Sequence, residues 1–187
     1  ADVASEARRV ATLSPARGEG DVVIVRNLRK VYAPRGRAKA KVAVRSLSLG
    51  IPRSGCFGLL GANGAGKSTT MNVLTGAIHP TSGEAYVDGA DVRSNVGDAW
   101  QRTGYCPQSD PLLDNLTAAE TLRMFARIKG VQPDKIEALV AWYLELLGLR
   151  RFAHKLTKTY SGGTKRKLSL AIALVGEPEV VFLDEPS

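Results

Sequence analysis

The stretch that decides the fold is Gly61-Ala-Asn-Gly-Ala-Gly-Lys-Ser68. It follows the apolar run Phe57-Gly-Leu-Leu60, which predicts a buried strand, and it leads into residues 67–75, which predict a helix that stops at Gly76. Glycines in such a loop let backbone N–H groups converge on a phosphate without clashing Cβ atoms. The helix N-terminus adds partial positive charge at the same point. The stretch therefore predicts a binding site for a nucleoside triphosphate.

Two side chains of this loop carry the predicted chemistry. Lys67 supplies a full positive charge to the terminal phosphates, and the hydroxyl of Ser68 is a ligand for Mg²⁺. The alternative, a chance glycine-rich turn, does not explain why a Lys-Ser pair stands in register with the glycines. The loop thus predicts a nucleotide bound together with Mg²⁺.

An apolar stretch near the end of the sequence delivers two acidic residues. Val180-Val-Phe-Leu183 predicts a buried parallel strand with Asp184 and Glu185 at its carboxyl end, the edge at which open α/β sheets bind ligands. Asp184 is predicted to hold Mg²⁺ opposite Ser68. Glu185 is predicted to orient and polarise an attacking water as a general base. The alternative for Glu185 is a solvated charge at a strand end.

A second candidate anion site is Tyr160-Ser-Gly-Gly-Thr164, which opens a helix that continues through Lys165-Arg-Lys167. A serine hydroxyl, two unhindered backbone amides and a helix N-terminus suit an anion. Taken alone, Ser-Gly-Gly is more often a turn with a helix cap. Because Lys67 already serves the phosphate loop of this chain, the second element indicates a site that another subunit completes.

The rest of the pattern predicts an α/β core, a small antiparallel β region and an inserted helical lobe. Strands are predicted at 22–25, which residues 28–32 either extend or leave, and at 42–51, 81–89 and 103–108. After these strands the residue pattern predicts helices: Thr117 and Glu120 form a predicted capping box, and Pro133 starts the next helix.

The predicted domain organisation follows from these elements. Residues 1–20, rich in Ala, Arg and Gly, are predicted to be a flexible linker, and residues 21–187 to form one domain. The helical subdomain is predicted at about 109–165, between two core strands.

Composition limits the classes of function. The 187 residues carry a formal net charge of +8, and none of their apolar runs approaches the roughly 20 residues that span a bilayer. The densest basic stretch, Arg35–Lys41, has no interleaved aromatic residues and predicts a solvated loop between two strands. Cys56 and Cys106 show no paired spacing, so both are predicted to be buried, reduced thiols of a cytosolic protein.

Together these motifs resemble the nucleotide-binding domain of ATP-binding cassette (ABC) transporters, from about Val22 to the last residue. The matching motifs are the Walker A loop (Gly61–Thr69), the Q-loop glutamine (Gln108), the signature (Ser161–Thr164), the Walker B strand (Val180–Glu185) and the A-loop aromatic that stacks on adenine (Tyr32). The stretches 104–108, 159–169 and 171–176 are more specifically similar to subfamily A, the lipid exporters.

This resemblance implies a P-loop NTPase (RecA-like) core that binds ATP and Mg²⁺ and hydrolyses ATP to drive transport of lipids. The implied partners are a second cassette, bound head to tail, and the transmembrane domains of the same transporter. Such a cassette lies on the cytoplasmic face of a membrane, touches the membrane only through its partner domains and binds no nucleic acid.

The resemblance also implies the site residues. Catalytic roles fall to Lys67, Gln108 and Glu185, and metal ligation to Ser68, Gln108 and Asp184. The nucleotide would be bound by Tyr32, Gly61, Asn63, Gly64, Ala65, Gly66, Lys67, Ser68 and Thr69, and across the pair by Ser161, Gly162 and Gly163.

Two departures from the family pattern stand out. Thr164 occupies a signature position that is usually Gln, and the sequence stops at Ser187, before the D-loop and the switch histidine. His79 and His154 both precede the Walker B strand, so neither fills the switch position. We therefore expect a cassette that is incomplete at its C-terminus but keeps its nucleotide-recognition residues, with hydrolysis belonging to the complete, paired form.

Two other classes of function compete with a transporter cassette. A soluble ABC ATPase acting on ribosomes or nucleic acid would suit the charge of +8, and its binding to RNA or DNA would weaken steeply with salt. An unrelated phosphate-loop GTPase or kinase explains neither Tyr160–Thr164 nor the helical insertion. A GTPase would also carry an Asn/Thr-Lys-x-Asp stretch, which this sequence lacks.

Overall fold

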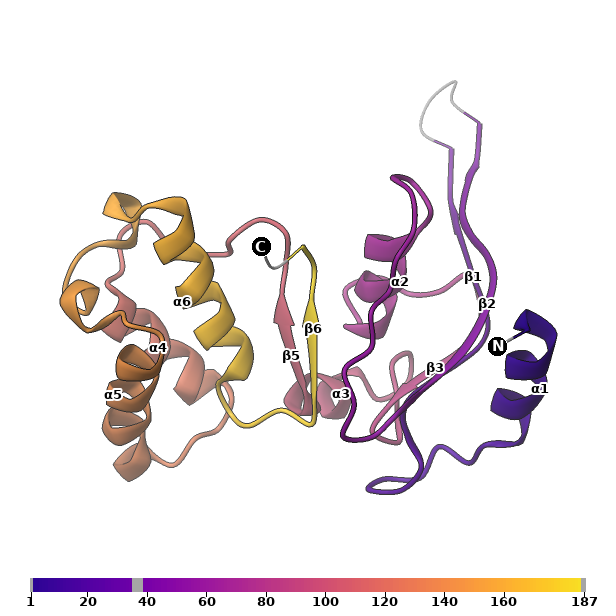
Figure 1. The fold of residues 1–187 in the computed structure, drawn as a ribbon, viewed down its shortest axis with the longest axis horizontal. Helices are drawn as coiled ribbons and strands as arrows, with labels where there is room; N and C mark the ends of the chain where they lie inside the picture. The colour runs from indigo at the N-terminus through magenta and orange to yellow at the C-terminus, as the bar shows by residue number, and fades with distance from the viewer. Residues whose placement is uncertain (1, 35–38, 186–187) are drawn as a thin grey trace. The chain divides into compact units, whose positions relative to one another are not determined.

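The computed structural model describes residues 2–34 and 39–185, so residues 35–38 of the predicted basic loop lie outside the described residues. The chain divides into two compact units, residues 1–102 and 103–187, and each unit contains its own sheet (Figure 1). In the described ranges, no helix is both long and apolar enough to cross a bilayer.

Antiparallel pairing holds the first unit together. Among its described residues the strand order is β2-β1-β3-β4, and each neighbouring pair is antiparallel. The strands are β1 (Asp21–Tyr32), β2 (Lys41–Pro52), β3 (Ser82–Val87) and β4 (Ala90–Asp91). Val23, Val25 and Leu28 of the central strand β1 are completely buried. The predicted antiparallel region is therefore confirmed, with β4 as an addition that the sequence pattern did not indicate.

The helices of the first unit are α1 (Val3–Thr12), α2 (Lys67–Leu74) and α3 (Val96–Arg102). α2 confirms the helix predicted after the glycine loop, because it ends just before Gly76, whose φ of +70° lies in the left-handed region. α3 was not predicted.

α1 differs from the flexible linker expected over residues 1–20. Asp2 caps this helix, and Val10 is completely buried. The Arg9 guanidinium lies 2.8 Å from the Asp21 carboxylate, and Arg26 donates to the Val10 carbonyl at 3.0 Å. One buried apolar residue makes no stripe that periodicity can detect. The ion pair with Asp21 and the hydrogen bond from Arg26 both come from β1, which is distant in sequence.

The strand predicted at residues 57–60 is not formed. In the described structure no strand lies between β2 and α2, and the side chains of Phe57 and Leu60 are 46% and 92% exposed. An apolar run predicts burial, but a strand also needs a neighbour to complete its hydrogen bonds, and no strand of the first unit pairs with this run. Cys56, expected to be buried beside it, is exposed.

The second unit is a parallel strand pair with a helical lobe. β5 (Thr103–Cys106) and β6 (Val180–Leu183) pair in parallel. The prediction of a parallel strand at residues 180–183 is therefore confirmed. The helical elements are α4 (Ala118–Ile128), η1 (Pro133–Lys135), α5 (Ile136–Leu146), η2 (Arg150–Phe152), η3 (Thr157–Thr159) and α6 (Gly162–Leu174). Leu122, Leu149 and Leu168 are completely buried in one apolar cluster of this lobe.

The two helix starts that the sequence predicts for the lobe, at Thr117 and at Pro133, are confirmed. Thr117 and Glu120 form the predicted capping box: the Thr117 hydroxyl accepts the Glu120 amide at 3.2 Å, and the Glu120 carboxylate accepts the Thr117 amide at 2.8 Å. Pro133 does begin a helical segment, first as the 3₁₀ turn η1 and then as α5.

A buried carboxylate ties the β3–β4 turn to the rest of the first unit. Asp88 and Gly89 have φ values of +44° and +79°, the signature of a tight hairpin turn. The Asp88 carboxylate, only 3% exposed, accepts hydrogen bonds from Arg53, from Arg102 at 2.7 Å and from the Gly18 amide at 3.3 Å. Burial raises the pKa of Asp88, but these hydrogen bonds outweigh burial and hold the pKa below its ordinary value.

Asp88→Asn is expected to destabilise the chain at pH 7 by about 3 kcal/mol, because the partly buried Arg53 and Arg102 lose a buried charged partner while Asn keeps the left-handed turn. A depressed pKa adds stability above the unfolded pKa of about 3.9 and loses it as the pH falls through the lower folded value. Urea unfolding should therefore show that the difference in the free energy of unfolding between wild type and variant becomes smaller below about pH 4. The exposed Asp134→Asn is the control, and a gap that stays constant down to pH 3 contradicts the assignment.

Candidate functional site

The phosphate loop of the first unit has the backbone that its glycines allow. Gly64 and Gly66 have φ values of +83° and +97°, and α2 begins directly after Gly66. A Cβ on Gly66 would lie 2.6 Å from the carbonyl oxygen of Ala43 in β2. Both the left-handed φ and the close approach of β2 therefore require glycine at this position.

Lys67 folds back over this loop. Its Nζ donates to the carbonyl oxygens of Gly61 at 2.7 Å and Ala62 at 3.2 Å. Among the described residues no carboxylate forms a salt bridge with Lys67. The ammonium charge is held by neutral acceptors only, so an anion at the loop would meet an uncompensated cation at the N-terminus of α2.

Tyr32 stands beside the same loop. It is the last residue of β1, its side chain is partly exposed, and its hydroxyl lies 3.4 Å from the hydroxyl of Thr69 in α2. The Lys30 ammonium lies 5.3 Å from the centroid of the Tyr32 ring, and it also donates to the His79 carbonyl at 2.6 Å. The structure thus brings the predicted adenine-stacking ring to the predicted phosphate loop, and adds a cation at that ring that the sequence did not indicate.

The other predicted residues of this loop are open to solvent. Gly61, Asn63, Gly64, Ala65 and Ser68 are all exposed. The Ser68 hydroxyl belongs to the first turn of α2, where a helix N-terminus presents backbone donors. The loop and the edge of β2, from Val42 to Leu47, border a cleft of about 450 Å³.

In the second unit, strand register brings two predicted catalytic side chains together. Cys106 of β5 is the register partner of Leu183 of β6, so Gln108 and Glu185 each lie two residues beyond a matched pair. The Gln108 amide nitrogen donates to the Glu185 carboxylate at 2.7 Å. This contact leaves the amide oxygen of Gln108 and the second carboxylate oxygen of Glu185 available to other partners.

Asp184 lies at the same strand end. It is only 7% exposed, and its amide donates to the Cys106 carbonyl at 2.9 Å, which extends the β5–β6 ladder by one bond. A carboxylate, an amide oxygen and a hydroxyl are the oxygen ligands that Mg²⁺ prefers. The donor types at Asp184 and Gln108 in this unit, and at Ser68 in the first unit, therefore fit the predicted metal.

The signature residues occupy the N-terminus of α6. Ser161 caps this helix, with its hydroxyl 2.9 Å from that of Thr164. Gly162 and Gly163 are exposed, and a Cβ on either one would meet nothing within 4 Å. Among the described residues, packing therefore does not require glycine at these two positions.

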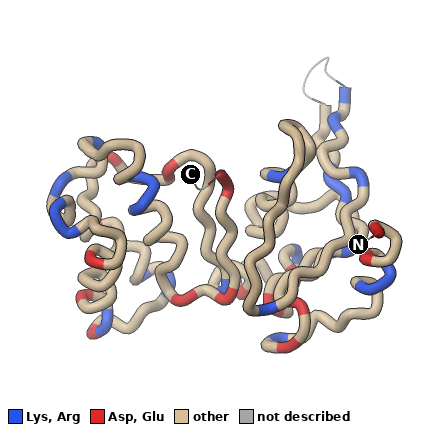
Figure 2. Tube along the Cα trace, viewed as in Figure 1, with Lys and Arg blue, Asp and Glu red and all other residues tan. Residues whose placement is uncertain are grey.

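The strand ends and the signature border one cleft of the second unit. The cleft has a volume of about 500 Å³, and its lining includes Gln108, Glu185, Gly162 and Gly163. Leu170, Leu183 and Cys106 form its apolar part. Burial raises the pKa of the Cys106 thiol, as expected for an unreactive buried cysteine. The coloured tube shows the basic start of α6 and the acidic end of β6 in this same unit (Figure 2).

Sequence patterns did not find one contributor to this cleft. Arg166 lies in the first half of α6, lines the cleft, and donates hydrogen bonds to backbone carbonyls just past the ends of β5 and β6. It stands between two lysines, so only knowledge of which face of α6 meets β5 could have distinguished it from them.

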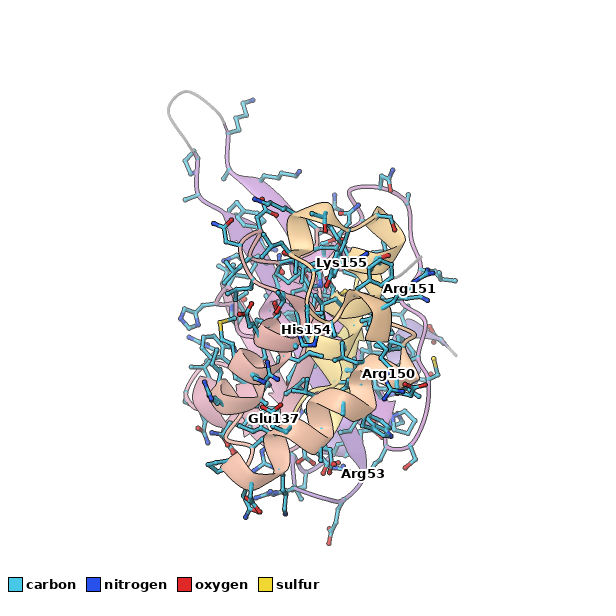
Figure 3. The ribbon with its side chains drawn as sticks, turned by 90° about the vertical axis from the view of Figure 1, so that its left-hand side faces the viewer. Arg53, Glu137, Arg150, Arg151, His154 and Lys155 are labelled. Carbon is cyan, nitrogen blue, oxygen red and sulfur yellow. The ribbon has the colours of Figure 1, made fainter. Side chains whose placement is uncertain are left out.

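Neither histidine joins these groups. His154 is exposed on the segment between η2 and η3, close to Arg151 and Lys155 (Figure 3). His79 contributes only its backbone carbonyl, to Lys30.

Comparison with known proteins places this geometry in a family. A family model described as ABC transporter matches residues 44–187. Phospholipid-transporting ATPase ABCA3 of Homo sapiens is 50% identical over 186 residues, which is 100% of this chain and 11% of that protein. ATP-binding cassette sub-family A member 7 of Mus musculus is 47% identical over 186 residues, or 100% of this chain and 8% of that protein. The chain thus spans about a tenth of the length of the curated relatives it matches.

A solved structure has the same fold. The dimeric ATP-binding cassette MJ0796, bound to ADP and Pi in a post-hydrolysis state, matches with a TM-score of 0.80 at 25% identity. The match covers 88% of this chain and 74% of that one.

Gly66→Ala is expected to destabilise the chain by about 1–3 kcal/mol, because the new Cβ meets Ala43 and the residue keeps a strained positive φ. Gly97→Ala in α3 is the matched control: its site is open and its φ ordinary, so this change should be neutral or stabilising by up to about 1 kcal/mol. Urea unfolding of both variants checks the order. If Gly66→Ala is as stable as Gly97→Ala, the described loop backbone is wrong.

Proposed function

Because the chain belongs to the ABC transporter family, we propose that it is a cassette that binds Mg-ATP and, paired with a second cassette, hydrolyses it to drive transport of lipids across a membrane. The observation that carries the proposal is the glycine loop itself. Its left-handed glycines, the N-terminus of α2 and the uncompensated Lys67 charge together form a receptor for a polyphosphate.

Each unit supplies a different part of the proposed chemistry. In the first unit, Lys67 would bind the terminal phosphates and Tyr32 would stack on adenine, with Gly61–Thr69 wrapping the phosphate chain. In the second unit, Glu185 would accept a proton from the attacking water. Its contact with Gln108 supports this role, because one carboxylate oxygen is held in place and the other stays available to the water.

Ser68, Asp184 and Gln108 are the residues that would hold Mg²⁺. When bound, the metal would neutralise the charge that develops on the phosphates during transfer. Asp184 is nearly buried yet lies at a strand end, which keeps the carboxylate fixed in position. A fixed oxygen ligand suits Mg²⁺, which demands a near-ideal geometry.

A second cassette is the proposed partner of the signature. Ser161, Gly162 and Gly163 would contact the nucleotide held by that cassette. Their exposure, and the open space around both glycines, support a role toward another molecule. The dimeric form of the related cassette MJ0796 is consistent with such a pair.

Lipid cargo and a place on the cytoplasmic face of a membrane are proposed from the relatives. ABCA3 is named a phospholipid-transporting ATPase, and half of the residues of this chain are identical to it. Transmembrane domains of the same transporter would then carry the cargo, while the cassette would contact the membrane only through them.

Lys67→Ala is expected to lower the affinity for Mg-ATP by about 100-fold or more, because a charge-assisted contact to phosphate contributes about 3 kcal/mol. Calorimetric titration measures this. Lys155→Ala, which removes an exposed lysine from the helical lobe, is the control and should bind as wild type does. Full affinity in the Lys67 variant would remove the proposed role of this residue.

Glu185→Gln in the complete, paired transporter should abolish turnover while leaving ATP bound, because an amide cannot accept the proton of water at neutral pH. Trapped nucleotide after gel filtration and the rate of phosphate release check this. Glu145→Gln, which affects only an exposed ion pair with Arg150, should hydrolyse normally. Normal turnover in Glu185→Gln would show that another group is the base.

A further inference from the structure

Backbone carbonyls at the ends of β5 and β6 converge on one side chain of α6. Arg166 donates through Nη1 to the carbonyl oxygen of Pro107, and through Nη2 to those of Asp184 and Glu185, both at 2.7 Å. These carbonyls lie just past the last ladder pair of the strands, where the regular pairing of the sheet has ended. A partly buried carbonyl needs a donor, and the guanidinium supplies it to three at once.

The same helix holds the segment that follows Gln108. The Asp110 carboxylate lies 3.6 Å from Nη1 of Arg166 and accepts a hydrogen bond from the Ser169 hydroxyl at 2.8 Å. Gln108 is thus bracketed by two attachments to α6, one at Pro107 and one at Asp110. Glu185, which accepts the amide of Gln108, is attached through its own carbonyl.

The packing of α6 along β5 explains why Arg166 reaches the carboxyl ends of the strands. At the other end of the helix, a Cβ on Gly104 would lie 1.9 Å from the Ala173 carbonyl oxygen, so the two backbones touch there. Seven helical residues from Arg166 to Ala173 rise about 10 Å, and three strand residues from Gly104 to Pro107 span about 10 Å. The two contacts therefore mark the two ends of one helix-on-strand packing.

We propose that Arg166 is a positioning residue for ATP hydrolysis, which fixes the signature end of α6 relative to Gln108 and Glu185. In this proposal Arg166 takes no part in bond breaking and does not contact phosphate. It links the signature end of α6 to the ends of β5 and β6. Ser161–Gly163 and the carboxylate of Glu185 therefore keep a fixed position relative to each other. The inference rests on the proposed function.

Arginine suits this position better than lysine. The planar guanidinium has five donors in a fixed fork, whereas an ammonium is a point charge on a flexible chain. The Arg166 side chain is only 17% exposed, and the next residue along the helix, Lys167, is exposed. Successive helical residues differ by about 100° in direction, so a cation at 165 or 167 does not take the place of Arg166.

The test uses the full-length transporter with both cassettes, as wild type, Arg166→Gln, Arg166→Lys and the control Arg127→Gln. Arg127 is an exposed arginine on α4 of the same unit, so its replacement matches the change in charge. We expect Arg166→Gln to lower kcat by roughly 10- to 100-fold, as small misplacements of catalytic groups do, while the Kd for Mg-ATP changes by less than about threefold. Arg166→Lys should recover part of kcat, and Arg127→Gln should match wild type.

A second variant probes the same attachment without changing Arg166. Ser169→Ala frees Asp110 from one of its two bonds to α6, so it should lower kcat by a few-fold at an unchanged Kd. Combined with Arg166→Gln, its effect should be less than multiplicative, because both changes release the same segment. This variant carries the test if Arg166→Gln does not fold.

Three results would overturn the inference. An unchanged kcat in Arg166→Gln, or in Ser169→Ala where the arginine variant does not fold, removes the coupling. A parallel loss of kcat and nucleotide affinity, equal for Gln and Lys, points to general damage to the fold. If the losses of kcat in Arg166→Gln and Ser169→Ala multiply in the double variant, the two side chains do not hold the same segment. A wild-type transporter that does not hydrolyse ATP contradicts the proposed function instead, so the two failures are distinguishable.

Discussion

The second unit depends on a backbone contact that only glycine permits. Gly104 lets the carbonyl of Ala173 approach β5 more closely than any side chain would allow. α6 therefore lies directly on β5, and its first turns reach the carboxyl ends of β5 and β6. Because β5 and β6 are in parallel register, Gln108 and Glu185 emerge at the same level and meet at 2.7 Å. One missing Cβ thus places the signature helix against the acidic strand ends.

The first unit uses the same device for a different purpose. Gly66 has no Cβ to meet the Ala43 carbonyl, so the glycine loop approaches the backbone of β2 at the start of α2. The antiparallel pairing of β1 with β2 then carries Tyr32 to the hydroxyl of Thr69. In both units a sheet provides the rigid base, and a glycine lets another backbone approach closely: at the start of α2 in the first unit, and at the far end of α6 from the signature in the second.

Most local features could be predicted from the sequence because their signals are local. The capping box at Thr117, the helix after Gly66 and the strand before Asp184 each follow from neighbouring residues. The run at residues 57–60 has an equally clear apolar signal, but strand formation depends on a partner that the signal does not specify. α1 was missed for the opposite reason, since its stabilising contacts with Asp21 and Arg26 come from a strand.

The candidate site divides in the same way. Motif residues such as Lys67, Asp184 and Glu185 were named from spacing and type, and the contact between Gln108 and Glu185 agrees with a shared role. Arg166 could not be named, because its three carbonyl partners lie 18 to 59 residues away in sequence. Residues that touch a ligand leave a pattern in sequence, whereas residues that hold those residues in place are found only from contacts.

The central claim is that this chain recognises ATP, and calorimetric titration of the 187-residue chain with Mg-ATP tests it most directly, with GTP as competitor. Circular dichroism of the same sample establishes that the chain is folded. The account predicts saturable binding with one nucleotide per chain, in which ATP outcompetes GTP because Tyr32 stacks on adenine. A folded chain that takes up no nucleotide, or that binds GTP in preference, would contradict it.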